Sequence, residues 1–98
     1  MKATELLRRR ISYSESAFAE LVLWQLQAPL AGSAHPYKYR LAYGVNGVCV
    51  LRYDNEPGKG DHRHFRDKES RYVFGGVDKL LAAFQRDIER INREDSDA

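Results

Sequence analysis

The stretch "YKYRLAYGVNGVCVLRYD", residues 37–54, decides the fold. Its first half alternates Tyr and Leu with basic or small residues, which is the period-two pattern of a strand with one buried face. The dipeptide Asn46-Gly47 is the strongest two-residue signal for a hairpin turn, and the residues after it return as a second apolar strand. The sequence therefore predicts a β-hairpin over residues 37–54.

A two-residue turn also fixes which residues face each other across this hairpin. On one face, the predicted pairs are Val45 with Val48, Tyr43 with Val50, Leu41 with Arg52, and Tyr39 with Asp54; on the other they are Ala42 with Leu51, Arg40 with Tyr53, and Lys38 with Asn55. Cationic and aromatic side chains are then expected beside Asp54 and Asn55, at the end of the hairpin away from the turn.

Three further segments are expected to extend the sheet. Residues 17–26, "AFAELVLWQL", carry apolar residues at both parities, which favours a strand packed on one face and partly covered on the other, although a short helix also fits. Residues 61–65, "DHRHF", and 71–74, "RYVF", are shorter strand candidates, and the Pro and Gly residues around them indicate loops. The prediction is an antiparallel sheet of three to five strands.

The C-terminal part predicts a helix that covers this sheet. Residues 77–93, "VDKLLAAFQRDIERINR", space their apolar side chains as an amphipathic helix does, and Gly76 suits the cap position. Residues 1–16 are expected to hold a short helix or arm, and residues 94–98 a frayed acidic tail. The fold class is α+β, and residues 1–98 are expected to form one domain.

Composition places the chain among folded domains. Of its 98 residues, 43% are hydrophobic and 31% are charged, far from the composition of disordered chains. The net charge of +2 is a mild basic excess that permits nucleic-acid binding without requiring it. Between His35 and Arg66, Lys and Arg outnumber Asp and Glu six to three, and all three histidines occur there, so this middle third is the candidate functional region.

Cysteine usage and the absence of long apolar runs indicate where the protein works. The single Cys49 cannot form an internal disulfide, and no apolar run has the length of a signal peptide or a membrane span. A cytoplasmic location without a membrane partner is expected. The "GKG" of residues 58–60 lacks the rest of a nucleotide-phosphate loop, and no cofactor is expected.

The richest chemistry lies in "RYDNEPGKGDHRHF", residues 52–65. Residues two apart on a strand share a face, with side chains roughly 7 Å apart, so His62 and His64 are candidates for the base and the acid on either side of an RNA phosphodiester. In metal-independent cleavage the base removes the 2′-OH proton, a cation stabilises the phosphorane, and the acid protonates the leaving 5′-oxygen. Lys59, Arg40 or Arg63 would supply the positive charge.

Other interpretations of these residues stay open. An H-x-H pair is common in metal sites, where Asp54 or Asp61 would complete a mixed nitrogen and oxygen shell; two solvent-facing loop histidines without chemistry are a further alternative. The tyrosines of residues 37–43 are expected to pack the sheet, with stacking faces for unpaired bases as the alternative. Trp24 is expected in the core.

Residues 35–64, "HPYKYRLAYGVNGVCVLRYDNEPGKGDHRH", closely resemble the TumE family of bacterial toxin-antitoxin proteins. The hallmarks of that family are an "H-x-Y-K-Y-R-L-x-Y" strand and the motif "R-Y-D-N-E-x-G-K-G-D-H-R-H". The resemblance continues more weakly to the helix and covers about two thirds of the chain. Pro36 and Gly75-Gly76 depart from the usual pattern, outside the second motif. The family signature falls on Lys38, Tyr39, Arg40, Tyr43, Arg52, Asp54, Asn55, Lys59, Asp61, His62 and His64.

The resemblance implies a type II toxin that a helix-turn-helix antitoxin neutralises. The expected architecture is also similar to that of the RelE/ParE toxins, which include ribosome-dependent mRNA nucleases and gyrase poisons. We therefore expect a metal-independent endoribonuclease that acts on RNA or the ribosome, with a homodimer as a possible assembly. The alternatives are a non-catalytic toxin that binds a protein or nucleic-acid target, and a metal-dependent nuclease that uses the H-x-H pair.

These arguments assign two sets of site residues. The expected catalytic residues are His62, His64, Lys59 and Arg40, and no metal ligand is assigned. The expected substrate-binding residues are Lys38, Tyr39, Arg52, Tyr53, Asp54, Asn55, Asp61 and Arg63.

Overall fold

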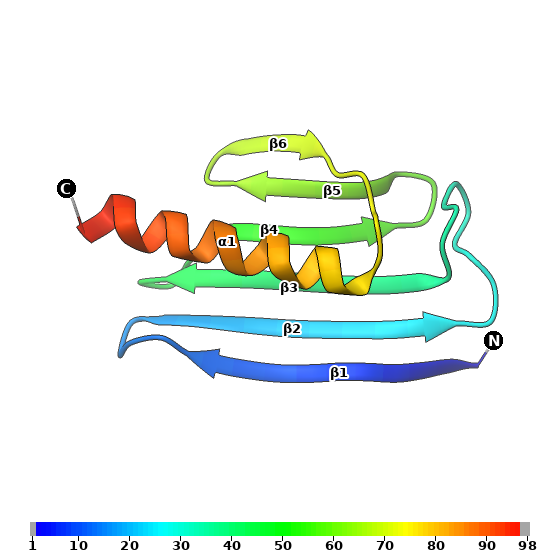
Figure 1. Ribbon diagram of the computed structural model, residues 1–98, viewed down its shortest axis with the longest axis horizontal. Helices are drawn as coiled ribbons and strands as arrows, with labels where there is room; N and C mark the ends of the chain where they lie inside the picture. The colour runs from blue at the N-terminus through cyan, green and yellow to red at the C-terminus, as the bar shows by residue number, and fades with distance from the viewer. Residues whose placement is uncertain (1, 97–98) are drawn as a thin grey trace.

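Within residues 2–96, six antiparallel strands form one sheet whose spatial order follows the sequence, and one helix lies across it (Figure 1). The computed structural model describes residues 2–96. The elements are β1 (Ala3–Ser12), β2 (Ala17–Leu26), β3 (Tyr37–Val45), β4 (Val48–Glu56), β5 (Gly60–Phe65), β6 (Lys68–Arg71) and α1 (Val77–Ser96). The predicted α+β class is confirmed, and the strand count is one above the predicted range.

The core lies between α1 and the middle strands. Five of its sheet side chains come from β3 and β4, where alternate residues point toward the helix; these are Tyr39, Leu41, Tyr43, Leu51 and Tyr53. From α1, every third or fourth residue meets them; these are Leu80, Phe84, Ile88 and Ile91. Each of these nine side chains is at most 2% exposed, so the tyrosine stripe packs the sheet as predicted.

A β-bulge in β4 changes the predicted hairpin register. Val45 faces Val48 as expected and Gly44 faces Cys49, but Tyr43 then faces Leu51, which leaves Val50 as an extra residue. The remaining pairs are Ala42 with Arg52, Leu41 with Tyr53, and Arg40 with Asp54. The predicted pairs beyond Val45 with Val48 are therefore wrong by one residue.

The bulge sorts the residues of β4 by polarity. A shift of one residue moves every later side chain to the other face of a sheet. Leu51 and Tyr53 thereby reach the core, while Arg52 and Asp54 point away from α1. The carbonyl of Val50 accepts a hydrogen bond from the Arg66 amide at 2.8 Å, which satisfies the bulged residue.

The expected N-terminal helix is wrong, because residues 3–12 form β1. Although Glu, Leu and Arg favour helices, β1 pairs with β2 along its whole length, and tertiary pairing outweighs intrinsic propensity. The expected strand at residues 71–74 is also misplaced, since β6 ends at Arg71 and residues 72–76 lead into the helix without regular structure.

The helix begins where the sequence predicts. The amide of Leu80 donates to the carbonyl of Gly76 at 3.0 Å, which is the first helical hydrogen bond. α1 continues to Ser96, so residues 94–96 of the expected frayed tail are helical; residues 97–98 lie outside the described part. Within residues 2–96, no helix is long and apolar enough to cross a membrane.

Candidate functional site on the open face of the sheet

The face of the sheet opposite α1 carries both histidines of the H-R-H motif. His62 faces Asp54 across the β4–β5 pair and His64 faces Arg52, while Glu69 of β6 lies opposite His64 on the other side. Because Leu51, Tyr53 and Phe65 of the same strands point toward the helix, these residues all point the other way. Three strands thus place two imidazoles, a guanidinium and carboxylates together.

This constellation lines a cavity of about 490 Å³ on the open face. Its lining residues are Arg52, Asp54, Glu56, Lys59, His62, His64 and Glu69. Five of these were predicted site residues, and the structure brings them together from β4, β5 and the turn between these strands. We call this the histidine cavity.

His64 has a defined hydrogen-bond role in the histidine cavity. Its Nε2 lies 3.0 Å from Nη2 of Arg52. A guanidinium can only donate hydrogen bonds, so Nε2 of His64 must accept and the ring proton lies on Nδ1. In this arrangement Nε2 of His64 is a hydrogen-bond acceptor that faces Arg52.

His62 lies beside hydrogen-bond acceptors, whereas His64 lies beside a donor. Its Nε2 donates to the carbonyl oxygen of Lys59 at 2.7 Å, and its Nδ1 lies 3.4 Å from Oε1 of Glu69. Both ring nitrogens of His62 therefore face acceptors, which suits an imidazolium. The same Glu69 oxygen is 3.8 Å from Nε2 of His64, so one carboxylate lies near both rings.

Arg52 links the histidine to the neighbouring carboxylate. Its Nε lies 3.1 Å from Oδ2 of Asp54, within ion-pair distance, yet among the described residues this buried nitrogen makes no hydrogen bond of acceptable geometry. Lys59, whose side chain is 72% exposed, pairs with Glu56 at 3.6 Å. The cavity thus holds two cations, Arg52 in its floor and the more exposed Lys59 at its rim.

The comparison with known families agrees with this motif. The family described as Toxin TumE matches residues 2–92. The chain belongs to the TumE toxin family. Membership of this family assigns a toxin function and points to a cognate antitoxin as partner. No curated protein and no solved structure matches the chain.

Several residues of the TumE signature lie on the helix side of the sheet, outside the histidine cavity. Asn55, 1% exposed, accepts a hydrogen bond from the Tyr39 amide at 2.9 Å and donates one to the Tyr37 carbonyl at 2.6 Å. These two bonds join β3 and β4 beyond their last register pair, Arg40 with Asp54. Asn55 thus holds the strand end in place.

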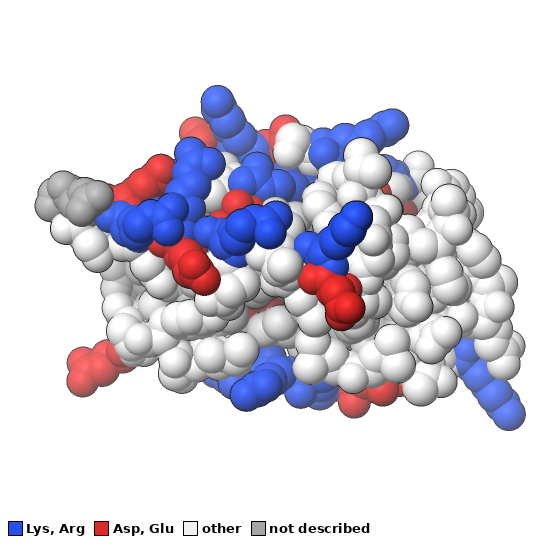
Figure 2. All heavy atoms as spheres, in the orientation of Figure 1, with Lys and Arg blue, Asp and Glu red and all other residues white. Residues whose placement is uncertain are grey.

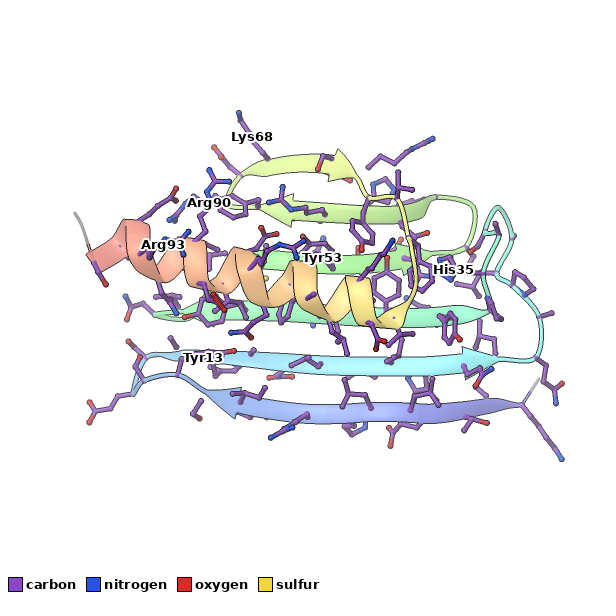
Figure 3. The ribbon with its side chains drawn as sticks, in the orientation of Figure 1. Tyr13, His35, Tyr53, Lys68, Arg90 and Arg93 are labelled. Atoms are coloured by element: carbon purple, nitrogen blue, oxygen red, sulfur yellow. The ribbon has the colours of Figure 1, made fainter. Side chains whose placement is uncertain are left out.

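Asp61 is the centre of a second buried cluster on the helix side. Its Oδ2 accepts hydrogen bonds from the Tyr39 hydroxyl at 2.5 Å and from Nε2 of His35 at 2.9 Å. The His35 ring also stacks on Phe74, with centroids 3.9 Å apart, beside the segment that leads into α1 (Figure 3). Burial, followed by the bond to Asp61, raises the pKa of Tyr39.

Arg63 points away from the histidines although it lies between them in sequence. Its guanidinium forms two hydrogen bonds with the Asp87 carboxylate of α1, at 2.8 and 3.0 Å, and these bonds raise its pKa. The hydroxyl of Tyr53 donates to the same carboxylate at 2.5 Å beneath α1 (Figure 3). Arg63 and Tyr53 therefore anchor the helix to the sheet.

Two predicted cations, Lys38 and Arg40, are not among the residues that line the histidine cavity. The ammonium of Lys38 donates to the backbone carbonyl of Asn55. Arg40 is exposed, and within residues 2–96 it forms neither an ion pair nor a side-chain hydrogen bond. Figure 2 shows the helix side, where Lys and Arg side chains lie over α1 and around β6; the open face lies behind it.

Sequence reasoning missed Glu69 and the role of His35. Glu69 lies in the run "RDKES", whose charged residues are typical of a turn. In the structure only Arg66 and Asp67 form the turn, because Phe65 pairs with Lys68, and Glu69 therefore belongs to β6. Within residues 2–96, no group of three or more His, Cys, Asp or Glu side chains is placed to hold a metal ion.

Proposed function

We propose that this TumE-family toxin inhibits growth by cleaving RNA without a metal ion, in the histidine cavity. The observation that carries the proposal is the opposite hydrogen-bond environment of two neighbouring histidines. Nε2 of His64 accepts from a guanidinium, whereas both nitrogens of His62 face acceptors. One base and one acid side by side are what phosphodiester cleavage by internal transfer requires.

His64 acts as the base and His62 as the acid. When the phosphate enters, Nη2 of Arg52 exchanges its contact with His64 for one with the phosphate, while its Nε stays beside Asp54. The freed Nε2 of His64 removes the proton of the ribose 2′-OH. The 2′-oxygen bonds to phosphorus, and the bond from phosphorus to the 5′-oxygen breaks. Nδ1 of His62 gives its proton to that leaving oxygen, because the proton on Nε2 of His62 is already donated to the backbone carbonyl of Lys59. The products are a 2′,3′-cyclic phosphate and a 5′-hydroxyl.

Cations around the cavity stabilise the charge that develops on the phosphorane. Arg52 is the closest to His64, through Nη2. Lys59 reaches from the rim, and Arg40 lies opposite Asp54 on the next strand. Asp54 and Glu69 hold Arg52 and His62 in place, while Tyr39, Tyr53, Asn55, Asp61 and Arg63 support the strands from the helix side.

The cations on the open face of the sheet also suggest which partners bind there. Lys38, Arg40 and Arg52 provide charge for an RNA backbone, either free or on the ribosome. A neutralising antitoxin, of the helix-turn-helix type that the family motif implies, would have to deny RNA access to this face. An acidic segment of such a partner would complement the cations there.

Incubation of the purified toxin with bacterial total RNA and with ribosomes, with and without a chelator, tests the proposal. Wild type should generate cyclic-phosphate and 5′-hydroxyl ends in the presence of chelator, and His62→Ala or His64→Ala should lower the rate by about 10²–10⁴-fold. Lys68→Ala, on the other side of the sheet, is the control. Chelator-sensitive cleavage would support the metal-dependent alternative, and tight binding without turnover the non-catalytic one.

A further inference from the structure

A second cavity lies on the open face, next to the histidine cavity. It has a volume of about 200 Å³ and lies at the turn end of the β3–β4 hairpin. Phe18 of β2 forms one wall, Val48 and Cys49 of β4 form the opposite side, and Ala42 and Gly44 of β3 lie between them. We call this the hairpin groove.

The hairpin groove exists because β3 carries small residues there. A Cβ atom on Gly44 would stand 3.9 Å from two ring atoms of Phe18 and 3.7 Å from the Val48 carbonyl oxygen. These are ordinary van der Waals distances, and Gly44 is not among the residues with positive φ. Neither crowding nor backbone strain therefore requires glycine at this position, yet any larger side chain would occupy the groove.

Charged side chains surround the Phe18 wall of the groove. The guanidinium of Arg10 lies over the Phe18 ring, 4.0 Å from its centroid, and also approaches Glu20 at 3.5 Å. Arg10 thus covers one face of the Phe18 ring, and the ring lines the groove beside Gly44. Glu20 and Arg40 line the rim, offering an acceptor and donors to the edge of a flat ligand.

Sheet register places the groove beside the histidines. Ala42 of the groove faces Arg52, which faces His64, and Arg40 faces Asp54, which faces His62. Adjacent strands lie about 4.8 Å apart, so groove and histidines are separated by roughly 10 Å. Arg40, free of ion pairs with the described residues, lies between the two cavities.

We propose that the hairpin groove binds an unpaired base of the RNA strand whose phosphate is cleaved in the histidine cavity. The inference rests on the proposed function and specifies single-stranded RNA as its substrate. A groove with an aromatic wall, a glycine-lined floor and two polar rim groups fits one planar base. Arg40 meets the phosphate that connects this base to the reacting nucleotide.

The alternative occupant is an apolar side chain of the antitoxin. The apolar wall and floor of the groove would also accept an apolar side chain. The charged rim, with the free guanidinium of Arg40 on the side of the histidines, favours a ligand that continues as a phosphate chain. The two occupants are separated by measuring RNA binding and antitoxin binding in the same variants.

Binding of a labelled, single-stranded 2′-O-methyl RNA of mixed sequence tests the inference. This RNA lacks the attacking hydroxyl, so its affinity is measured whether or not the toxin cleaves RNA. Gly44→Leu fills the groove and Phe18→Ala removes its wall, and each should raise Kd at least about fivefold. Gly44→Ala adds a Cβ atom that meets its neighbours at ordinary van der Waals distances. This variant should weaken binding less, and it replaces Gly44→Leu in the test if the Leu variant does not fold. Val73→Ala, at an 82% exposed site in the segment leading into α1, is the control.

The outcomes separate the two proposals. Groove variants that bind this RNA as wild type does would overturn the base site, whatever is found for cleavage. Groove variants that lose only antitoxin binding would overturn it in favour of the protein occupant. Groove-dependent RNA binding without any cleavage would retain the base site and reject the ribonuclease mechanism. A duplex of the same sequence should bind more weakly, and equal binding would contradict recognition of an unpaired base.

Discussion

Nη2 of Arg52 lies 3.0 Å from Nε2 of His64, and this contact fixes the protonation pattern of the imidazole. Arg52 and His64 share a face because they are partners across the β4–β5 pair, and the bulge at Val50 decides which face this is, because without it Arg52 would point toward the helix. A local irregularity of one strand therefore creates the catalytic arrangement that we propose.

The first prediction concerns the tautomer of His64. With Arg52 present, Nε2 should show the nitrogen chemical shift of an unprotonated acceptor, with the proton on Nδ1. Arg52→Ala removes the donor, so the usual Nε2–H tautomer should gain population, and cleavage should fall about 10²-fold or more. Two-dimensional ¹⁵N spectra of the His rings measure the first effect. An unchanged His64 spectrum in Arg52→Ala would contradict the assignment.

The second prediction separates Arg63 from the histidines that flank it. Arg63→Ala breaks the bonds to Asp87 and should lower the free energy of unfolding by about 2 kcal/mol. Because Arg63 points away from the histidine cavity, RNA cleavage at a temperature where the variant is folded should stay within a few-fold of wild type. Urea unfolding and a cleavage assay measure the two effects. A large loss of cleavage without a loss of stability would show instead that Arg63 contacts the substrate phosphate.

The third prediction concerns the buried side chain of Asn55, whose hydrogen bonds join β3 and β4. Asn55→Ala leaves the Tyr39 amide and the Tyr37 carbonyl without partners and should cost about 2–4 kcal/mol of stability. Asn55→Asp keeps the acceptor but cannot donate to the carbonyl, so it should also destabilise. Denaturant unfolding with Gln27→Ala, at an exposed loop position, as control measures this. Wild-type stability in both variants would argue that Asn55 is free to bind substrate instead.

The fourth prediction is a loss of stability at alkaline pH. The pKa of the Tyr39 hydroxyl is raised in the folded state, above the value of 10.0 of a free tyrosine, by burial and then by its bond to Asp61. The unfolded chain therefore releases this proton first, and stability present below pH 10 is lost as the pH rises beyond it. Each such tyrosine contributes at most about 1.4 kcal/mol per pH unit.

Tyr39→Phe should show a shallower decline of stability above pH 10 than wild type. Tyr13→Phe, in the exposed β1–β2 turn, is the matched control and should retain the wild-type slope. Unfolding free energies measured by denaturant from pH 8 to 11 give the comparison. Equal slopes for Tyr39→Phe and wild type would show that this hydroxyl titrates alike in the folded and unfolded chains.

Much of the fold follows from local patterns in the sequence. The turn at Asn46-Gly47 and the helix start at Val77 each have a strong signal, in turn chemistry and helical period, while the apolar content of residues 17–26 favoured the observed strand over a short helix. The H-x-H pair was correctly expected on one face of a strand. These features depend on neighbours in sequence, which is why they were predictable.

The features that escaped prediction depend on tertiary pairing. The run Val48–Leu51 is apolar at every position, so period two does not reveal that Val50 is bulged. β1 has helix-favouring residues and becomes a strand only through β2. Which face each site residue occupies follows from that bulge, so the division between His62, His64 and Arg52 on one side and Asn55, Asp61 and Arg63 on the other required the structure.

The most direct test of the central claim is to induce the toxin in a bacterial host and sequence the 5′-hydroxyl ends of cellular RNA. Wild type should produce new ends that are absent with the His62→Ala/His64→Ala double variant expressed at the same soluble level. The flanking sequences would then identify the RNA that is attacked. Growth arrest by wild type without new RNA ends would contradict histidine-dependent RNA cleavage and direct attention to a protein target.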